Sequence, residues 1–297
     1  EPTASWWDCG EYISTAFKLQ VGHPPGAPFF QLIGRFFSLF AFGNLLHVAK
    51  MINIMSALSS SFTILFLFWT ITALAKKIAL KKQGELSKAQ QYIIFGSGIV
   101  GALAYTFSDS FWFSAVEGEV YAMSSFFTAF VFWAILKWDE VADDKNSTRW
   151  LILIAYFIGL SIGVHLLNLL AIPAISFVFY FKKYKPSWKG IIITAVISIL
   201  ILAFIMYGII PEIVNLFAKT ELLFVNSFGF PFNAGTVFFA LILIGFIVFG
   251  LLFTGKKDSK KIISTVFIIL SSIFILLIFI FVYLLFFTTF RSLLIPP

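Results

Sequence analysis

The chain has 297 residues, of which 60% are hydrophobic and 12% are charged, and its mean hydropathy is +0.97. Soluble domains carry about 25% charged residues, so the composition excludes an ordinary soluble protein and indicates a protein of the bilayer. A net charge of +7 could indicate a nucleic-acid-binding protein. The distribution of the basic residues along the chain, described below, argues against this. The single cysteine, Cys9, excludes an internal disulfide.

The first predicted element is a short polar helix, "WDCGEYISTAFKL" (7–19). Asp8 and Glu11 are three residues apart, so both carboxylates share one face if the segment is helical. Two acids so placed can divide a task, one as base and one supporting it or binding a polar ligand. The alternative is a solvated helix end with two idle acids. The flanking aromatic residues argue against it, because they would bury that face.

His23 precedes two prolines in "HPPGAP" (23–28), which fix an extended backbone and the direction of the imidazole. The alternative is a rigid elbow with no chemical role, because the motif leads directly into "APFFQLIGRFFSLFAFG" (27–43). That segment is apolar at most positions but carries Gln31 and Arg35. We expect a helix that lies in the membrane interface or re-enters the bilayer.

Eight membrane-spanning helices are predicted after this segment, each an apolar run near the roughly 20 residues that a span needs. The predicted spans are about 48–75, 92–109, 119–138, 150–164, 166–181, 190–210, 235–254 and 262–287. The fourth and fifth are short. Between them, "GVHLLN" (163–168) is either a tight turn or a buried polar site.

The basic residues alternate between loops in a way that predicts the orientation. One set of alternate loops holds all but five of the 21 Lys and Arg residues. The segments on the opposite side of the membrane carry the remaining five, which are Lys18, Arg35, Lys50, Lys219 and Arg291. Cytoplasmic loops carry the excess of Lys and Arg, so the opening segment is predicted to lie outside. The excess of positive charge is therefore explained by the orientation of the protein in the membrane, and no nucleic-acid partner is predicted.

Acids and imidazoles from three outer segments are predicted to converge: the opening segment, "SDSFWFSAVEGEVY" (108–121) and "GVHLLN". Ionisable groups inside a bilayer cost about 2.5–3.5 kcal/mol on insertion scales, so they tend to face a cavity and to act there. Glu117 and Glu119 flank a glycine at the start of a span. Complementing the helix N-terminus is the alternative role, and it suits Glu119 better than Glu117.

Two further candidates have structural alternatives. His165 lies beside Asn168 between two apolar helices, where a satisfied buried pair is the simpler interpretation. Arg291 in "TTFRSLLIPP" (288–297) is the only cation of the last outer segment. Arginine suits phosphate recognition, and capping the last span is its alternative.

Motifs for metals and nucleotides are absent from the sequence. There is no CxxC, no HExxH, no Walker loop and no dinucleotide fingerprint, and the three histidines lie far apart. Carboxylates from two loops could hold a divalent ion, but spacing alone does not show one. No metal ligand and no cofactor are predicted.

Four stretches resemble the bacterial membrane family known as domain of unknown function 2723, which is similar to the protein O-mannosyltransferases of the C-type glycosyltransferase superfamily. Within roughly residues 1–185, they are 5–40, 51–69, 102–125 and 149–174. "FRSLLIPP" (290–297) is similar to the Arg-Ser…Pro-Pro segment of the family. Residues 186–285 are generic membrane sequence.

The resemblance implies an all-α polytopic membrane protein with a C-type glycosyltransferase-like helical bundle, a polyprenyl-phosphate sugar donor and action on the non-cytoplasmic face. It also implies that an acid of the first outer loop is the base, and Asp8 stands where that motif falls. "GHPPGAP" (22–28) is similar to the His-Pro-Pro element of the same loop. The first transmembrane helix and the large soluble C-terminal part of the family are missing, so we expect a fragment.

The sequence thus predicts three parts: an extracytoplasmic first loop with an interfacial helix (1–47), an eight-span domain (48–287) and an outer C-terminal segment (288–297). Transfer of a sugar to a Ser or Thr hydroxyl needs a base, and the leaving lipid phosphate needs a cation. Asp8 is the predicted base, with Glu11 supporting it. The predicted donor- and substrate-binding residues are Lys18, His23, Glu117, Tyr121, His165, Asn168 and Arg291.

The predicted function is a membrane glycosyltransferase of the bacterial inner membrane, multi-pass and with an extracytoplasmic active face. Its partners are the lipid-linked donor, with mannose implied by the resemblance, an acceptor protein or peptide, and the bilayer. The alternative is a transporter or flippase of lipid-linked sugars, or a non-catalytic membrane scaffold. A transporter should carry ionisable residues near mid-bilayer, whereas the mid-span stretches 191–205 and 262–281 carry no charge.

Overall fold

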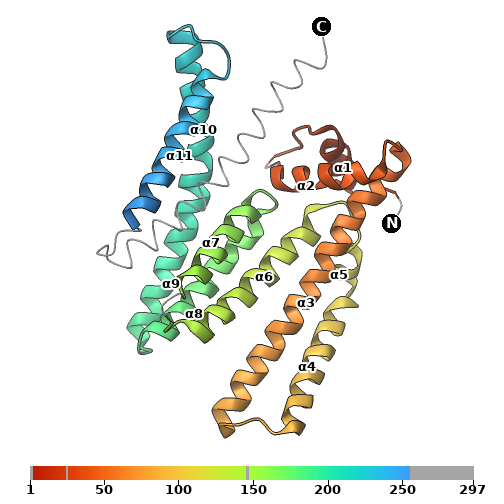
Figure 1. Cartoon of the computed structure of the whole chain (residues 1–297), viewed down its shortest axis with the longest axis vertical. Coiled ribbons are helices and arrows are strands. Elements are labelled where there is room, and N and C mark those ends of the chain that lie inside the picture. The colour runs from red at the N-terminus through yellow and green to blue at the C-terminus, as the bar shows by residue number, and fades with distance from the viewer. Residues whose placement is uncertain (1–2, 25, 145–146, 255–297) are drawn as a thin grey trace. The chain divides into compact units, whose positions relative to one another are not determined.

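The computed structural model describes residues 3–24, 26–144 and 147–254, and within them the chain is helical and contains no strand (Figure 1). The protein is an all-α polytopic membrane protein, as predicted. Its contacts divide it into two units. The first unit comprises residues 1–140 with 161–168, and the second comprises 141–160 with 169–297, as far as these are described.

The first unit begins with two short helices, α1 (Cys9–Lys18) and α2 (Pro28–Ser38), which lie across the N-terminal end of a long third helix (Figure 1). Helix α2 starts at a proline, which is favoured in the first helical turn. Gly34 lets it approach α1, because a Cβ there would lie 2.9 Å from that of Ala16. Arg35 ties the same pair by donating to the carbonyl of Phe17 at 2.9 Å.

The predicted interfacial segment 27–43 is therefore helical, ending in a 3₁₀ turn at Leu39–Ala41, and a second 3₁₀ turn, Leu45–His47, follows it. Its apolar helical stretch, Pro28–Ala41, is too short to cross a bilayer. Phe30 is buried against the unit, whereas Phe36 and Phe40 are exposed. One apolar face is thus left outward, as a helix in the membrane interface requires.

Helices α3 (Val48–Gln83) and α4 (Lys88–Thr106) form an antiparallel pair (Figure 1). Helix α4 starts with a capping box between Ser87 and Gln90. Gly98 brings the two helices close, because a Cβ there would lie 2.6 Å from a methyl carbon of Thr72. Small residues at such contacts are the usual means of helix packing in membranes.

The first unit is completed by α5 (Asp109–Ser114), α6 (Val120–Val141) and the turn at 161–168. Helix α6 packs on α3 through aromatic rings, with the centroids of Phe66 and Phe130 5.2 Å apart. The carbonyl of Gly163 accepts a 2.7 Å hydrogen bond from the amide of Phe29. This bond ties the turn to the start of α2.

The second unit contains most of α7 (Thr148–Ile162), then a 3₁₀ segment from Leu166–Leu170, α8 (Ala171–Lys183), α9 (Trp188–Ala203), α10 (Ile210–Leu222) and α11 (Ala234–Thr254). Two π-helical segments, Phe204–Ile209 and Leu223–Ser227, continue α9 and α10 into one run of 40 residues. Helix α11 packs beside α10 (Figure 1). The turn between them is closed by Glu221, which accepts from the amides of Asn233 at 2.5 Å and Thr236 at 2.9 Å.

Four described helical runs are long and apolar enough to cross a membrane. They are Leu45–Lys81, Val120–Val141, Leu166–Lys183 and Trp188–Ser227, and they correspond to the spans predicted at 48–75, 119–138, 166–181 and 190–210. The last run does not end at 210, because a π-helical segment places Pro211 in the first turn of α10, where proline needs no amide donor.

Three other predicted spans are helical but do not reach that length and hydropathy among the described residues. The span at 92–109 is α4, whose first turns are polar, and the span at 150–164 is α7, which has 15 residues. The span at 235–254 is α11, apolar over Ala234–Phe246. The span at 262–287 lies outside the described residues. The total of eight spans stays a prediction.

Candidate functional site

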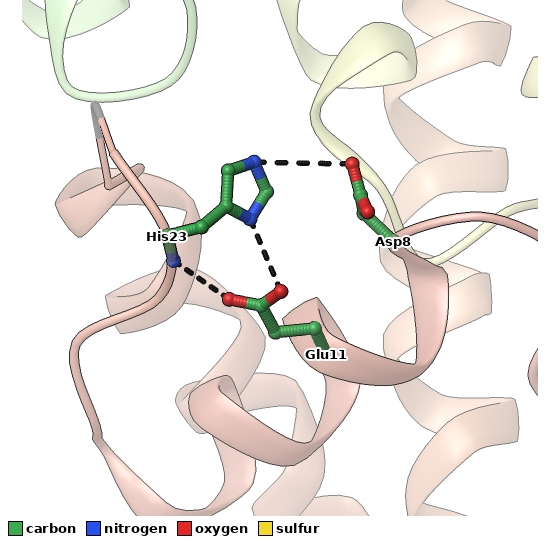
Figure 2. A group of neighbouring side chains, drawn as sticks. All are labelled: Asp8, Glu11 and His23. Atoms are coloured by element: carbon green, nitrogen blue, oxygen red, sulfur yellow. Dashed lines mark hydrogen bonds and ion pairs between the residues drawn. The ribbon is translucent and has the colours of Figure 1, made fainter.

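The N-terminal end of α1 gathers two carboxylates around one imidazole (Figure 2). His23 Nδ1 lies 3.1 Å from Glu11 Oε2, and its Nε2 lies 3.8 Å from Asp8 Oδ2. The backbone amide of His23 also donates to Glu11 Oε1 at 2.6 Å. The structure therefore brings together the two acids and the histidine that the sequence singled out. They are named the triad below.

Asp8 occupies the N-cap position of α1 but does not cap it. An N-cap aspartate usually accepts from the second or third amide of the helix, whereas the Asp8 side chain makes no such bond. Its backbone carbonyl accepts from the amide of Tyr12 at 2.9 Å, so the helix begins normally. The carboxylate instead lies toward His23, with an exposed fraction of 41%. It is positioned for a ligand or a proton.

Glu11, in the first turn of α1, is the acid that holds the histidine. The backbone amide of His23 and then its ring lower the pKa of Glu11 below its usual range. The helix N-terminus favours the same charged form. Gly22 permits the approach of the loop, because a Cβ there would come within 3.2 Å of Glu11 Oε1. Whichever tautomer His23 adopts, its second ring nitrogen is directed at Asp8.

Tyr12 forms the floor of this cluster. Its ring stands edge-on to His23 with centroids 5.7 Å apart and edge-on to Phe30 at 5.4 Å. Burial, followed by the negative charges of Glu119, Asp8 and Glu11, raises the pKa of Tyr12 to about 12. The phenol therefore stays protonated at neutral pH.

A second pair of acids, Glu117 and Glu119, lies in the loop before α6, and the charges of Asp8 and His23 act on Glu119. Both are buried, with exposed fractions of 4% and 6%. Gly118 between them fits against α1 and α3, because a Cβ there would lie 2.8 Å from Ile13 Cγ1 and 2.9 Å from Asn53 Oδ1. Glu117 accepts a hydrogen bond from the hydroxyl of Ser5.

Glu119 is a further functional candidate, predicted from the sequence to be one of the outer acids but not included in the predicted site residues. Burial, followed by the negative charges of Glu117 and Asp8, raises its pKa to about 7, and His23 acts in the opposite direction. No described residue donates a hydrogen bond to its carboxyl group. The sequence favoured a helix N-terminus role, and Glu119 does directly precede α6. The clue in the sequence was the glycine between the two acids, which permits close packing.

Tyr121 and His165 lie next to each other beyond Glu119, with ring centroids 5.7 Å apart. His165 Nδ1 accepts from the amide of Leu167 at 3.1 Å, so the neutral ring carries its proton on Nε2. Burial lowers the pKa of His165. Asn168 is buried and accepts from Thr128 at 3.0 Å, while its Nδ2 has no partner in the described part of the chain. The pairing of His165 with Asn168 suggested by the sequence is therefore wrong, because each has its own partner.

The two cations predicted to bind phosphate are not found in this cluster. Lys18 is exposed in the last turn of α1, ten residues from Asp8, which corresponds to about 15 Å of helix. Arg291 lies outside the described residues. The only ion pairs that the four clustered acids form with described residues are those of Asp8 and Glu11 with His23. The cluster can therefore accept protons and attract cations.

Comparison with known proteins points to one family. Residues 8–188 match the family model described as the protein O-mannosyl-transferase TMEM260 N-terminal domain. A protein O-mannosyl-transferase tmem260 of Dictyostelium discoideum is 26% identical over 198 residues, which cover 63% of this chain and 22% of that protein. The Mus musculus protein O-mannosyl-transferase TMEM260 is 27% identical over 156 residues, which cover 52% of this chain and 19% of that protein.

The chain thus matches about a fifth of the length of these curated relatives. No solved structure matches. The matched segment begins at Asp8 and contains the triad, both buried glutamates, Tyr121, His165 and Asn168. The predicted resemblance to protein O-mannosyltransferases is confirmed.

Proposed function

Because the chain belongs to the family of the protein O-mannosyl-transferase TMEM260 N-terminal domain, we propose that it carries the catalytic acids of a membrane glycosyltransferase. The enzyme moves a sugar, mannose by family resemblance, from a polyprenyl-phosphate donor to a Ser or Thr hydroxyl of a protein. The proposal places the reaction on the extracytoplasmic face of the bacterial inner membrane, where the distribution of basic residues locates the first loop (1–47). The segments 48–287 and 288–297 are the membrane domain and the outer C-terminal segment.

The observation that carries the proposal is the Asp8 carboxylate, which stands at a helix N-cap without capping it. In the proposed reaction the acceptor oxygen forms a bond to the anomeric carbon of the donor sugar. The bond from that carbon to the phosphate oxygen breaks, and the polyprenyl phosphate leaves with the bonding electrons. Asp8 takes the hydroxyl proton as the new bond forms, which is general base catalysis.

Glu11 and His23 support this step by their contacts. Glu11 holds both the amide and the ring of His23, so the imidazole is fixed opposite Asp8. A base works best when the groups around it are held rigidly. When the ring is protonated, its positive charge lies 3.8 Å from Asp8 Oδ2 and would stabilise the carboxylate before the hydroxyl arrives.

The remaining predicted residues are assigned to substrate contacts. Glu117, Tyr121, His165 and Asn168 are proposed to line the sugar and acceptor pocket, and the neighbouring rings of Tyr121 and His165 support this assignment for that pair. Lys18 and Arg291 are proposed to bind the donor phosphate. Lys18 would do so at a distance from Asp8, where the lipid phosphate enters, since it lies at the other end of α1.

The test is sugar transfer by membranes that contain the full-length protein. Parent and Asp8→Asn proteins receive radiolabelled polyprenyl-phosphate mannose and a Ser- and Thr-containing peptide. Asn keeps the shape but cannot act as a base, so we expect at least about a hundredfold loss of transfer. Asp109→Asn is the matched control, because Asp109 is an exposed aspartate at the start of α5 and is not one of the acids that pair with His23.

Two outcomes would overturn the proposal. If the parent protein transfers no sugar but binds or translocates the lipid donor, the protein is a transporter or flippase. If Asp8→Asn transfers sugar as fast as the Asp109→Asn control, Asp8 is not the base.

A further inference from the structure

We propose that Asp8, Glu11 and His23 form a binding site for one divalent cation of the Mn²⁺ class. The inference rests on the proposed function, because the ion would sit where the donor phosphate reacts. It goes beyond that function, since general base catalysis at Asp8 requires no ion. The sequence predicted no metal ligand, because the three residues follow no known metal motif.

The geometry of the triad suits one ion. Asp8, Glu11 and His23 each offer one ligand atom, and these three atoms all lie within 4.8 Å of one another. Metal–ligand bonds of about 2.0–2.2 Å place neighbouring octahedral ligands about 3 Å apart and opposite ligands about 4 Å apart. Glu11 Oε2 lies 3.1 Å from Nδ1 of His23, which falls in this range, whereas Asp8 Oδ2 lies 3.8 Å from the other ring nitrogen, Nε2, so Asp8 or the imidazole would have to rotate for both acids to share an ion with one nitrogen. Small side-chain rotations would complete the site.

The charge balance around the triad also favours a cation. The charges of Asp8, Glu11 and Glu119 act on Tyr12, and those of Asp8 and Glu117 act on Glu119. Among the described side chains, His23 is the only one that forms an ion pair with any of these four acids. Several carboxylates near a low-dielectric membrane domain are unfavourable without a counter-charge. A divalent ion would supply that charge at the centre of the group.

An independent observation is the unpartnered carboxyl group of Glu119. This residue is only 6% exposed, and its carboxyl accepts no hydrogen bond from the described residues. A nearly buried carboxyl group without a protein donor takes its hydrogen bonds from water or from a ligand. Glu119 interacts electrostatically with both Asp8 and His23. An ion at the triad, with its remaining water ligands, would satisfy this acid from one side.

The set of ligands indicates which ion to expect. Two carboxylates with one imidazole combine the oxygen ligands that suit Mg²⁺ and Mn²⁺ with the nitrogen ligand that Mg²⁺ seldom takes. Mn²⁺ accepts both kinds, so it is the probe of choice. Zn²⁺ is the main competitor, because imidazole favours it.

The ion has a defined use in the proposed reaction. Bound to the triad, it would neutralise the phosphate oxygens of the donor and of the leaving group. A carboxylate has two oxygens, so Asp8 could bind the ion through one and accept the hydroxyl proton through the other.

The test is binding of Mn²⁺ alone to purified full-length protein in lipid nanodiscs after treatment with EDTA. Free Mn²⁺ is measured by electron paramagnetic resonance, which does not depend on sugar transfer. We expect one site in the parent protein and an affinity at least tenfold weaker in Asp8→Asn and His23→Gln. The matched controls are Asp109→Asn and His47→Gln, which change an exposed aspartate and an exposed histidine outside the triad.

The possible results distinguish failure of the ion site from failure of the proposed function. Absence of a Mn²⁺ site in the parent, or equal binding by the triad and control variants, would overturn the proposal. Asp8→Asn alone suffices if His23→Gln fails to fold, because the Asp8 side chain makes no bond to the backbone. Binding without sugar transfer would leave the ion site standing and overturn the glycosyltransferase. Unchanged transfer after complete Mn²⁺ removal would overturn the role of the ion and leave the glycosyltransferase intact.

Discussion

The acids near α1 in the first unit differ in their contacts from Asp143 and Glu221 in the second unit, although Asp139 and Glu140 of the first unit also pair with lysines. In the second unit, Asp143 pairs with Lys182 at 3.4 Å and with Lys183 at 3.1 Å, and Glu221 accepts from two backbone amides. These contacts satisfy the carboxylates inside the protein. In the first unit, Asp8 faces a histidine at 3.8 Å and Glu119 has no hydrogen-bond donor among the described residues.

This contrast separates structural acids from acids that are available for chemistry. A carboxylate that closes a turn or a surface ion pair has its partners within the fold. A carboxylate held near other acids, without a lysine or arginine, has to obtain its partner from outside, as a proton, a cation or a substrate hydroxyl. Four predictions test whether the contrast is real.

The largest effect is expected for the double variant Asp8→Asn/Glu11→Gln. It removes the base and the group that holds His23, so transfer should fall on the order of a thousandfold. Initial rates with labelled lipid-linked sugar provide the measurement. The matched pair is Asp143→Asn/Asp144→Asn in the second unit, which should stay within about twofold of the parent because these exposed acids contribute little. Equal losses of sugar transfer in both double variants would show that the acids near α1 do not differ in function from those of the second unit.

The next effect is a pH dependence of stability that comes from Glu119. Its pKa is raised from 4.5 to about 7 in the folded protein, so the folded state binds the proton more tightly than the unfolded state. The resulting stabilisation is full below about pH 4.5 and is lost as the pH rises through about 7. The shift corresponds to at most about 3 kcal/mol.

Thermal denaturation of EDTA-treated protein between pH 5 and pH 8 would check this prediction. The melting temperature of the parent should fall across that window, and Glu119→Gln should show a flatter profile because Gln does not titrate. If the two profiles are parallel, Glu119 does not carry the raised pKa.

A smaller effect is expected when Gly118 becomes alanine. The added Cβ would meet Ile13 Cγ1 at 2.8 Å and Asn53 Oδ1 at 2.9 Å, and such overpacking costs about 1–3 kcal/mol. It should also shift Glu117 and Glu119 away from α1 and reduce transfer. Gly10→Ala is the control, because a Cβ at this position in α1 meets nothing within 4 Å. Alanine should stabilise that helix by up to about 1 kcal/mol. A Gly118→Ala protein as stable as the Gly10→Ala control would show that the loop at Gly118 is not closely packed against α1 and α3.

The smallest effect is expected for Glu221→Gln in the second unit. The amide keeps one oxygen acceptor for the amides of Asn233 and Thr236 but loses the charge, which should cost about 1 kcal/mol in thermal denaturation. Sugar transfer measured at a permissive temperature should remain near that of the parent. A loss of transfer comparable to that of the triad variants would place Glu221 among the functional acids.

Much of the triad could be predicted from local sequence. The three-residue spacing of Asp8 and Glu11 is a helical property, and α1 forms as that spacing requires. The same rule should have separated Lys18 from Asp8, because ten residues of helix cannot be folded back on themselves. Lys18 therefore stays a proposed contact of the donor phosphate and is not a neighbour of Asp8.

The burial of Glu119 could not be found in this way. Whether Glu119 complements a helix N-terminus in water or is buried beside Asp8 depends on α1 and α3 reaching Gly118, and these helices are distant in sequence. His165 and Asn168 look like partners because they are neighbours in the chain, yet Leu167 and Thr128 are their actual partners. Side-chain pairing depends on packing, which local spacing does not contain.

The sequence by itself determined that this is an all-α membrane protein. An apolar run of about 20 residues is a local property of the sequence, and it is sufficient for a helix to span the hydrocarbon core of a bilayer. It also determined that Asp8 and Glu11 share a helix face. Only the tertiary structure decided which acids have partners within the protein. That outcome depends on close contacts at Gly22 and Gly118, where the absence of a side chain lets His23, Glu117 and Glu119 approach α1.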